Sequence, residues 1–356
     1  MAFFNTYIYN KKVNRKDKIN MKKIKVLSLI LLVSLTSCNS SSNGINKLNF
    51  KILSPSGAPS IAYSSFIKES KDNISIVEPS SMASKISSKE YDAFIFDLSN
   101  ACKLIKNNNL DYKLVTCLTI GNCYCVSTGN DLDNTISSDD KIVSFGSNST
   151  FTKIFEKIHN VKVSYEVSGV SQTPSIIKTG KYNGEDIDYV LVAEPVLTSL
   201  FSSKSDNDKY TLVENVTTKW QEYSKKEGLN DSNGYSGYIQ AGLFISSKLE
   251  KDEYKDDINY FLNTIKETIY DIKNNNASAT LNNINEFVKS NLIEEDYFGV
   301  NYSILNKVLN SSTNPNNISN PFGFNWGDFD INKFIKESNL DGLDQIDDSL
   351  FSKYYI

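Results

Sequence analysis

The feature that most constrains the fold of this chain is a regular alternation of short apolar segments with short amphipathic segments between Leu48 and Ile245. The apolar segments predict strands at residues 48–53, 74–77, 93–96, 113–119, 123–127, 142–145, 161–167, 189–193 and 241–245. The amphipathic segments predict helices at residues 61–68, 100–107, 150–158, 172–179 and 196–201. Because parallel strands need crossover connections, this order predicts α/β sheets with helices on both faces.

The C-terminal third is predicted to be helical. Residues 255–274 place Ile258, Phe261, Ile265 and Ile269 on one helical face, which is typical of a long helix packed on a sheet. Shorter helices are predicted at residues 281–292, 302–309 and 331–336. Residues 310–330 are rich in Asn, Ser, Gly and Pro and are predicted to form a loop.

Two polar stretches interrupt the alternation, at residues 129–140 and 202–233, and each adjoins a strand that can pass between two lobes. We therefore predict an interrupted first lobe with a second lobe inserted into it. Lobe 1 is predicted to comprise residues 47–125 and 239–356, lobe 2 residues 126–238, and the crossing strands residues 123–128 and 239–245.

The first 37 residues are predicted to be a leader that is removed. Lys22, Lys23 and Lys25 precede an apolar run that is too short to span a bilayer comfortably, as in an export signal. The sequence Leu-Thr-Ser-Cys at 35–38 resembles a bacterial lipoprotein signal, which implies that Cys38 is lipidated and that residues 38–46 are a flexible spacer. An ordinary cysteine after a short transmembrane anchor is the alternative. Because residues 1–20 lie upstream of this signal, we predict Met21 as the true start.

Composition excludes several classes of function. With 38 Lys+Arg against 42 Asp+Glu, the net charge is −4, so we expect no nucleic-acid partner. The single arginine, Arg15, lies in the leader, so the mature chain has no guanidinium with which to grip a carboxylate. His159 is the only histidine, which excludes a histidine-rich metal site, and we expect neither a metal nor a cofactor.

Four strand-to-helix loops carry the candidate ligand contacts: residues 54–59, 97–101, 146–150 and 193–195. In open α/β sheets, ligands sit beyond the carboxyl ends of the strands, where helix N-termini present N–H groups. Each loop by itself is typical of an ordinary helix cap. Their occurrence together predicts a shared cleft between the lobes.

Four stretches of the chain, at residues 54–62, 91–104, 187–198 and 238–246, resemble the solute-binding proteins of ABC importers, of the NMT1 and nitrate/sulfonate/taurine type. Gly121-Asn122-Cys123-Tyr124 stands where that family often has Trp-Gly-X-Tyr, with Ile120 at the Trp position. The resemblance implies a two-lobed, type II periplasmic-binding-protein-like fold, each lobe a mixed, mostly parallel sheet flanked by helices, with a helical C-terminal tail. The implied ligand contacts are Ser56, Gly57, Ala58, Ser99, Asn100, Gly121, Asn122, Ser147, Asn148, Ser149, Thr150 and Glu194.

The expected function is therefore that of an extracytoplasmic, lipid-anchored receptor, expected to be a monomer, that passes a small solute to an ABC permease and its ATPase. Helix N-termini and hydroxyls could hold a sulfonate or a nitrate-like anion. Glu194 could pair with an amine or with a pyrimidine N–H, unless it is a solvated residue beside a helix cap. The charge of the solute stays open.

Two alternatives remain from the sequence. One is an enzyme on the same fold, resembling the yeast pyrimidine-precursor synthase, which uses pyridoxal phosphate and its own histidine; here Cys123-Tyr124-Cys125 is a faint counterpart of its cysteine-rich segment. The other is a surface lipoprotein with an adhesive or structural role. The sequence argues against catalysis, because the only histidine, His159, is expected at a helix end on the surface. We also expect free thiols in the core at Cys102, Cys117, Cys123 and Cys125.

Overall fold

The computed structural model describes residues 47–131, 133–146, 148–274, 277–310 and 320–356. The chain divides into two compact units, Met1–Ile45 and Asn46–Ile356, and only the second is described below. The predicted leader, Met21, Cys38 and the whole predicted spacer therefore lie outside the described residues, as does Ser147. Within the described ranges, no helix combines the length and the apolar character needed to cross a membrane.

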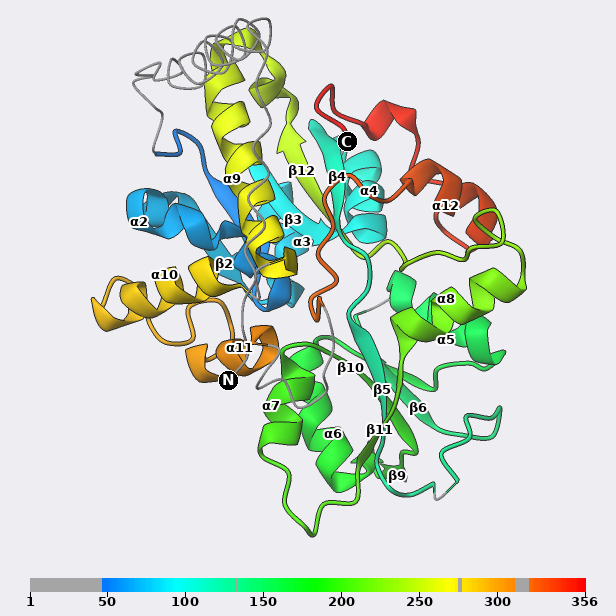
Figure 1. The fold of residues 1–356 in the computed structure, drawn as a ribbon. Helices are drawn as coiled ribbons and strands as arrows, with labels where there is room; N and C mark the ends of the chain where they lie inside the picture. The colour runs from blue at the N-terminus through cyan, green and yellow to red at the C-terminus, as the bar shows by residue number, and fades with distance from the viewer. Residues whose placement is uncertain (1–46, 132, 147, 275–276, 311–319) are drawn as a thin grey trace, which may run out of the picture. The chain divides into compact units, whose positions relative to one another are not determined.

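The first sheet has the strand order β2-β1-β3-β12-β4 (Figure 1). Its strands are β1 (Ile52–Pro55), β2 (Ile74–Val77), β3 (Ala93–Asp97), β4 (Tyr112–Thr119) and β12 (Ala241–Ser246). Strand β1 pairs in parallel with β2 and β3, whereas β12 runs antiparallel to both β3 and β4. The carboxyl ends of β1, β2, β3 and β4 therefore lie along one edge of the sheet.

The second sheet has the order β11-β5-β10-β6-β7. Its strands are β5 (Cys123–Ser127), β6 (Ile142–Phe145), β7 (Tyr165–Val167), β10 (Tyr189–Ala193) and β11 (Thr211–Asn215). Strand β6 is parallel to β7 and β10, and β5 runs antiparallel to β10 and β11. Because β5 starts at Cys123 and pairs within this sheet, the first crossing between the sheets is residues 120–122. Which residues move together as a lobe stays a prediction.

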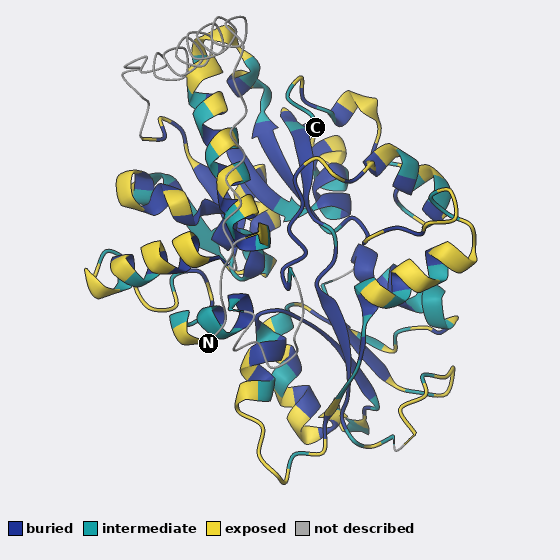
Figure 2. Ribbon diagram, in the orientation of Figure 1, coloured by how far each residue is buried: buried dark blue, intermediate teal, exposed yellow. Residues whose placement is uncertain are grey.

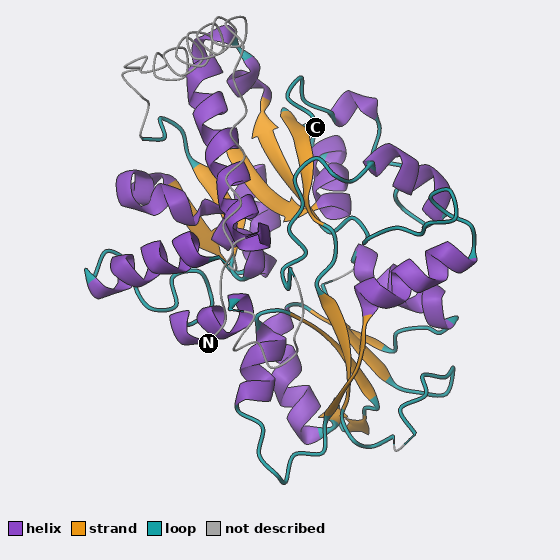
Figure 3. Cartoon of the chain, in the orientation of Figure 1, coloured by secondary structure: helices purple, strands orange, loops and turns teal. Residues whose placement is uncertain are grey.

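Helices cover both faces of each sheet (Figure 3). They are η1 (Ala58–Phe66), α2 (Ile67–Ser70), α3 (Met82–Ser87), α4 (Leu98–Asn107), α5 (Thr150–His159), α6 (Thr173–Thr179), α7 (Val196–Ser202), α8 (Val216–Lys226), α9 (Lys255–Asn274), α10 (Ser278–Lys289), α11 (Tyr302–Leu309) and α12 (Ile331–Ser338). The predicted fold class, two mixed sheets flanked by helices with a helical tail, is confirmed.

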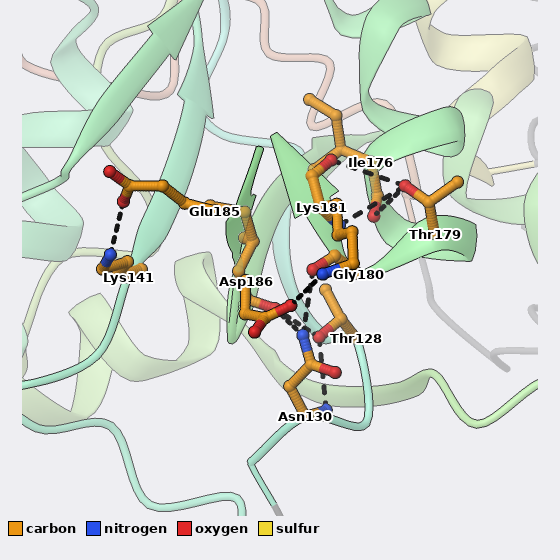
Figure 4. A network of polar contacts seen from close by, with 10 residues as sticks. Thr128, Asn130, Lys141, Ile176, Thr179, Gly180, Lys181, Glu185 and Asp186 are labelled. Atoms are coloured by element: carbon orange, nitrogen blue, oxygen red, sulfur yellow. Dashed lines mark hydrogen bonds and ion pairs between the residues drawn. The ribbon is translucent and has the colours of Figure 1, made fainter. Parts of the chain in front are cut away.

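A small hairpin of β8 (Lys181–Tyr182) and β9 (Glu185–Asp186) extends lobe 2 (Figure 4). Asn130 ties the hairpin to the strand β5 side of the lobe, because its side-chain amide donates to the Gly180 and Ile187 carbonyls, each at 2.9 Å. Lys181 pairs with Asp186 across the hairpin at 2.6 Å. The first predicted polar stretch thus has near its start a residue, Asn130, that is held by hydrogen bonds to the chain on either side of the hairpin.

Residues 202–233 are predicted above as a polar interruption of the strand–helix alternation. This prediction is wrong, because these residues contain β11 and α8. Helix α8 buries Val216, Trp220 and Ser224, one residue per turn, and the rest of its surface is polar. Such a narrow buried stripe gives little hydrophobic periodicity, so the sequence pattern did not reveal it. The predicted strand at 161–167 is also shorter, beginning at Tyr165.

Buried positions concentrate on the strands of both sheets (Figure 2). The buried apolar side chains of the described residues form three clusters. One lies between the first sheet and helices η1, α9, α10 and α11. Another lies between the second sheet and helices α6 and α7. The remaining cluster spans both sheets, joining α3 and α4 of the first to α5 and α8 of the second through tail residues such as Phe334 and Leu343. One face of the protein thus shares a continuous core, and the other has two separate cores.

The C-terminal tail also covers β4, the edge strand of the first sheet. Asn325 N–H donates to the Leu118 carbonyl at 2.7 Å, and Ile120 N–H donates to the Gly323 carbonyl at 2.8 Å. Further along β4, Ser352 N–H donates to the Leu114 carbonyl at 2.9 Å. Pairing of this kind leaves no long exposed edge at which another chain could add a strand.

Candidate functional site

The edges of the two sheets that carry the strand carboxyl ends meet at the crossing segments. Strand β4 ends at Thr119, and β5 begins at Cys123 after only three residues. Strand β5 runs antiparallel to β10 and β11, so its beginning lies at the edge where β10, β11 and β6 end. The strand-to-helix loops of both lobes therefore converge on residues 120–122 and on the return segment around Gln240.

The loop after β1 places Ser56, Gly57 and Ala58 at this edge, but the chain itself uses one of its amides. Gly57, with φ +100°, donates its N–H to the Phe298 carbonyl at 2.7 Å. The turn that carries Phe298 lies close above the loop, since a Cβ on Gly299 would stand 2.5 Å from the Ser56 Cβ. The Ser60 hydroxyl donates to the Gly57 carbonyl at 2.7 Å and fixes the start of η1.

The loop after β3 is a capped helix start. Asp97 accepts the Asn100 N–H at 2.8 Å, and Leu98 N–H donates to the Gln240 carbonyl at 2.8 Å. Burial raises the pKa of Asp97 to about 6, against the opposing effects of the Asn100 hydrogen bond and of the Lys103 and Lys153 charges. The predicted contact Ser99 is buried and donates its hydroxyl hydrogen to the Gly342 carbonyl in the tail, at 3.4 Å.

The loop after β6 is held by hydrogen bonds between side-chain hydroxyl groups. Thr152 Oγ1 lies 2.6 Å from Ser144 Oγ and 2.8 Å from Ser149 Oγ, and all three side chains are buried. Thr150 Oγ1 is also buried and has no hydrogen-bond partner among the residues that the structure describes. Asn148 is exposed, and its N–H donates to the Glu166 carboxylate at 3.2 Å.

Glu194 is buried, with 2% of its surface exposed, so the alternative of a solvated carboxylate is wrong. Its carboxylate accepts the Thr198 N–H at 3.0 Å and the Thr198 hydroxyl at 2.8 Å, which caps the start of α7. Burial, followed by the nearby charge of Glu194, raises the pKa of Tyr124 well above its usual value. Glu194 therefore has a structural role at a helix start, and it lies directly after β10 at the shared edge.

The crossing segments connect these loops. Gly121 has φ +99°, and a Cβ there would stand 2.6 Å from Thr217 Oγ1 and 2.9 Å from Tyr238 Cζ, so only glycine fits. The Gln240 side-chain amide donates to Asn122 Oδ1 at 2.9 Å. Through Gln240, the start of α4 is thus joined to Asn122.

The structure places the described candidate residues at one shared edge, and whether they bind a solute stays a prediction. Three contributors were missed by the sequence reasoning. Asn215 accepts the N–H groups of Thr217 and Thr218 and starts α8 at the same edge. Asn215 directly before Val216, with two threonines after it, is a cap signal that could have been noticed. The coverage by Phe298 and Gly342 has no local sequence signal, because both residues are far away in the chain.

Two grooves lie among the described residues, and one of them borders the crossing region. One, of about 660 Å³, is lined by the Gly121 crossing, the start of α8, and the tail near Asn325, with Lys273 and Asp328 paired at 3.3 Å beside it. The other, of about 860 Å³, lies between α5, residues 160–166 and the tail at 339–342. Neither is lined by the Gly57 loop or by Glu194.

The described thiols are buried and the histidine is at the end of a helix. Cys102, Cys117, Cys123 and Cys125 are free and buried, as predicted, and burial raises the pKa of Cys102 and Cys117 to about 12. His159 is the last residue of α5, and its Nε2 lies 2.8 Å from Glu214 Oε1. Among the described residues, no group of three or more His, Cys, Asp or Glu side chains could hold a metal ion.

No protein-family model matches this chain, and no curated protein matches it in sequence. Solved structures do resemble it. The ligand-binding component of an ABC-type import system from Staphylococcus aureus, solved with zinc bound, has 14% identity and a TM-score of 0.52, covering 73% of this chain and 82% of that one. An ABC transporter structure from Parabacteroides distasonis has 13% identity and a TM-score of 0.50, covering 74% and 88%.

The periplasmic nitrate-binding protein of Synechocystis PCC 6803 is similar to the same degree, with 11% identity, a TM-score of 0.50, and coverage of 74% of this chain and 70% of that one. At such identities the likeness shows a shared fold. The chain therefore has the fold of the periplasmic binding proteins of ABC importers, which the sequence resemblance implied.

Proposed function

We propose that this chain is an extracytoplasmic solute-binding lipoprotein of an ABC importer. It captures a small solute between its lobes and delivers it to the permease, and lipidated Cys38 holds it at the cell membrane. The observation that carries the proposal is the convergence of strand-to-helix loops from two sheets on one pair of crossing segments. This is the arrangement in which α/β proteins hold ligands at strand carboxyl ends.

The crossing geometry supports domain closure as the working motion. A solute that contacts both lobes stabilises the closed state by the contacts it makes there and nowhere else. The first crossing is only residues 120–122, so the change in backbone angles is confined to few residues, with Gly121 among them. We propose the lobe limits predicted above, 47–125 with 239–356 and 126–238, with the first boundary moved back to residues 120–122 because all of β5 pairs within the second sheet.

The first test is thermal unfolding of the purified protein with nitrate, ethanesulfonate, cytosine and putrescine, one from each candidate class. A binding partner at a hundredfold excess over its Kd stabilises the folded state by about 2.7 kcal/mol. Native mass spectrometry of the protein as purified searches for a retained solute outside this panel. Absence of any stabilisation and of any retained small molecule would contradict the proposal and favour the adhesive alternative.

The second test is the double variant Ser149→Ala with Asn100→Ala, which changes one predicted contact in each lobe. We expect weaker solute binding with an unchanged fold by circular dichroism. The matched control is Ser175→Ala with Asn282→Ala, two exposed positions on α6 and α10. Equal affinity of the two double variants would remove Ser149 and Asn100 from the site.

Lipid anchoring and the enzyme alternative have separate tests. Cys38→Ser should release the chain from the membrane fraction, and persistence there would contradict lipidation. Incubation with pyridoxal phosphate should give no imine absorbance, because the proposed solute-binding role uses no such cofactor. The only histidine, which that enzyme uses, is the last residue of α5, with its Nε2 2.8 Å from Glu214 Oε1. A clear lysine imine would revive the enzyme alternative.

A further inference from the structure

The C-terminal tail passes between the lobes twice more after the two crossing segments. Residues 323–325 pair with the edge of β4 in lobe 1. Helix α12 then packs on lobe 2, and residues 351–356 return to β4 in lobe 1. Any change in the angle between the lobes must therefore also be accommodated by the tail.

Helix α12 is firmly attached to lobe 2. The Phe334 ring is fully buried and lies 6.0 Å from the Trp220 ring of α8 and 5.3 Å from the Tyr235 ring. Glu337 accepts the Asn230 N–H at 2.8 Å and the Tyr235 hydroxyl at 2.7 Å. Figure 1 shows α12 beside α8.

The end of the tail is attached to lobe 1. Asp347 pairs with Lys106 of α4 at 2.5 Å, which holds the pKa of Asp347 at about 2. The Ser352 hydroxyl donates to Glu250 at 2.6 Å, and Ile356 N–H donates to the Val115 carbonyl of β4 at 3.0 Å. Side-chain and backbone contacts thus both secure this end.

Between these attachments, residues 339–342 touch both lobes. Lys153 of α5 donates to the Asp341 carbonyl at 2.7 Å, and Ser99 of α4 donates to the Gly342 carbonyl at 3.4 Å. Asn339 and Gly342, at the two ends of this link, have φ values of +47° and +76°. The link therefore lies across the starts of α4 and α5, which come from different lobes.

The two faces of the lobe pair differ in what opening would cost. On the face of α4, α5, α8 and α12, one apolar core continues through both lobes, and separation would expose it at roughly 25 cal/mol per Å². On the opposite face, the cores of the two lobes are separate, and α11 lies against α7. The favourable direction of opening is therefore on the η1, α7 and α11 side.

We propose that residues 331–343 are a strap that keeps the α4–α5 side of the lobes together, so that solute enters only from the side of η1, α7 and α11. With this strap in place, the lobes separate and approach each other only on the side of η1, α7 and α11. It also removes Ser99 from direct solute contact as long as Gly342 stays in place.

The test measures the motion itself and needs no solute, so it is independent of the proposed function. Spin labels are attached at pairs of introduced cysteines in the Cys38→Ser chain, where the described native thiols are buried. Ser199→Cys with Ser303→Cys spans the open side, and Asn107→Cys with Lys225→Cys spans the strapped side; all four positions are exposed. We expect a broad distance distribution for the first pair and a narrow one for the second. Equal widths, or the reverse order, would overturn the proposal.

The strap itself is then released with Lys333→Met and Glu337→Met. The first change removes the pair of Lys333 with Asp231 at 2.8 Å, and the second removes the oxygen that accepts from Asn230 and Tyr235, without opening a cavity. Lys336→Met, exposed on the same helix, is the matched control. We expect the strapped-side distribution to broaden in the double variant and to stay narrow in the control. If the double variant keeps the narrow distribution, Phe334→Ala is measured as well, and an unchanged width in both would overturn the strap.

Discussion

The two lobes satisfy the hydrogen-bonding groups of their strand-to-helix loops in different ways. In lobe 1, the Gly57 loop is covered by Phe298, the start of α4 by Gly342, and the end of β4 by Gly323, all from distant parts of the chain. In lobe 2, the corresponding groups are closed by neighbours: Thr152 with Ser149, and Glu194 with Thr198. Lobe 1 thus depends on contacts from distant residues at the edge that carries its strand carboxyl ends, whereas lobe 2 organises the corresponding edge locally.

The largest effect that this difference predicts is for Phe298→Ala. The ring is 2% exposed, and truncation of such a buried ring costs about 3–5 kcal/mol of unfolding free energy. Urea unfolding measures the loss, and hydrogen exchange should show faster exchange at the Gly57 amide, far away in sequence. Phe201→Ala in lobe 2, where the ring is only partly buried, should cost less. Unchanged exchange at Gly57 would break the comparison.

The next effect concerns Gly323, whose Cβ would stand 2.0 Å from the Gly121 carbonyl oxygen at a φ of +62°. Gly323→Ala is expected to cost about 3 kcal/mol, since overpacking and a left-handed residue both contribute. Gly184→Ala is the control: its φ is +84°, but nothing lies within 4 Å of the added carbon, so about 1 kcal/mol is expected. Similar unfolding midpoints for the two variants would show that the tail at Gly323 is not packed tightly against the crossing segment at Gly121.

Local closure in lobe 2 predicts a smaller and more confined effect for Thr152→Val. The variant keeps the side-chain shape but leaves the buried hydroxyls of Ser144 and Ser149 without the atom that joins them, at a cost of about 2 kcal/mol. Hydrogen exchange should change within residues 142–160 only. Thr179→Val, exposed on α6, is the control with little expected change. Spread of the effect into lobe 1 would contradict local organisation.

The smallest effect concerns the charge of Asp97. Its pKa is about 6 in the folded protein and near 3.8 when unfolded, so the folded state binds more protons between these values and its stability falls as pH rises from 4 to 6. Asp97→Asn keeps a good helix cap and removes this loss, so it should gain up to about 2 kcal/mol at pH 7 and nothing at pH 4. Urea midpoints at both pH values measure this.

Asp186→Asn is the control of opposite sign. The hydrogen bond from Lys181 holds the pKa of Asp186 below its usual range, so its charge favours the folded state at pH 7. The variant should therefore show no gain at pH 7. A gain in both variants would mean that net charge, and not the position of Asp97, is responsible.

Much of the fold could be predicted because its signals are local. The limits of β2, β5, β6, β10, α9 and α11 agree with the prediction, since apolar runs and helical faces are written in neighbouring residues. The prediction missed β11 and α8, where one buried residue per turn leaves too weak a pattern. It also could not distinguish a solvated Glu194 from the buried cap, because burial depends on what packs over the residue.

Local sequence patterns were enough to specify two α/β sheets, their strand-to-helix loops and the helical tail. The spacing of apolar residues and the helix-capping residues both involve only a few neighbouring positions. Only the tertiary structure decided that the tail reaches across both lobes, that Phe298 and Gly342 accept hydrogen bonds from an amide and a hydroxyl at the shared edge, and that one face shares a continuous core. These contacts join residues that are hundreds of positions apart. Which of them form is decided by the packing of the whole chain, because local preferences act over only a few residues.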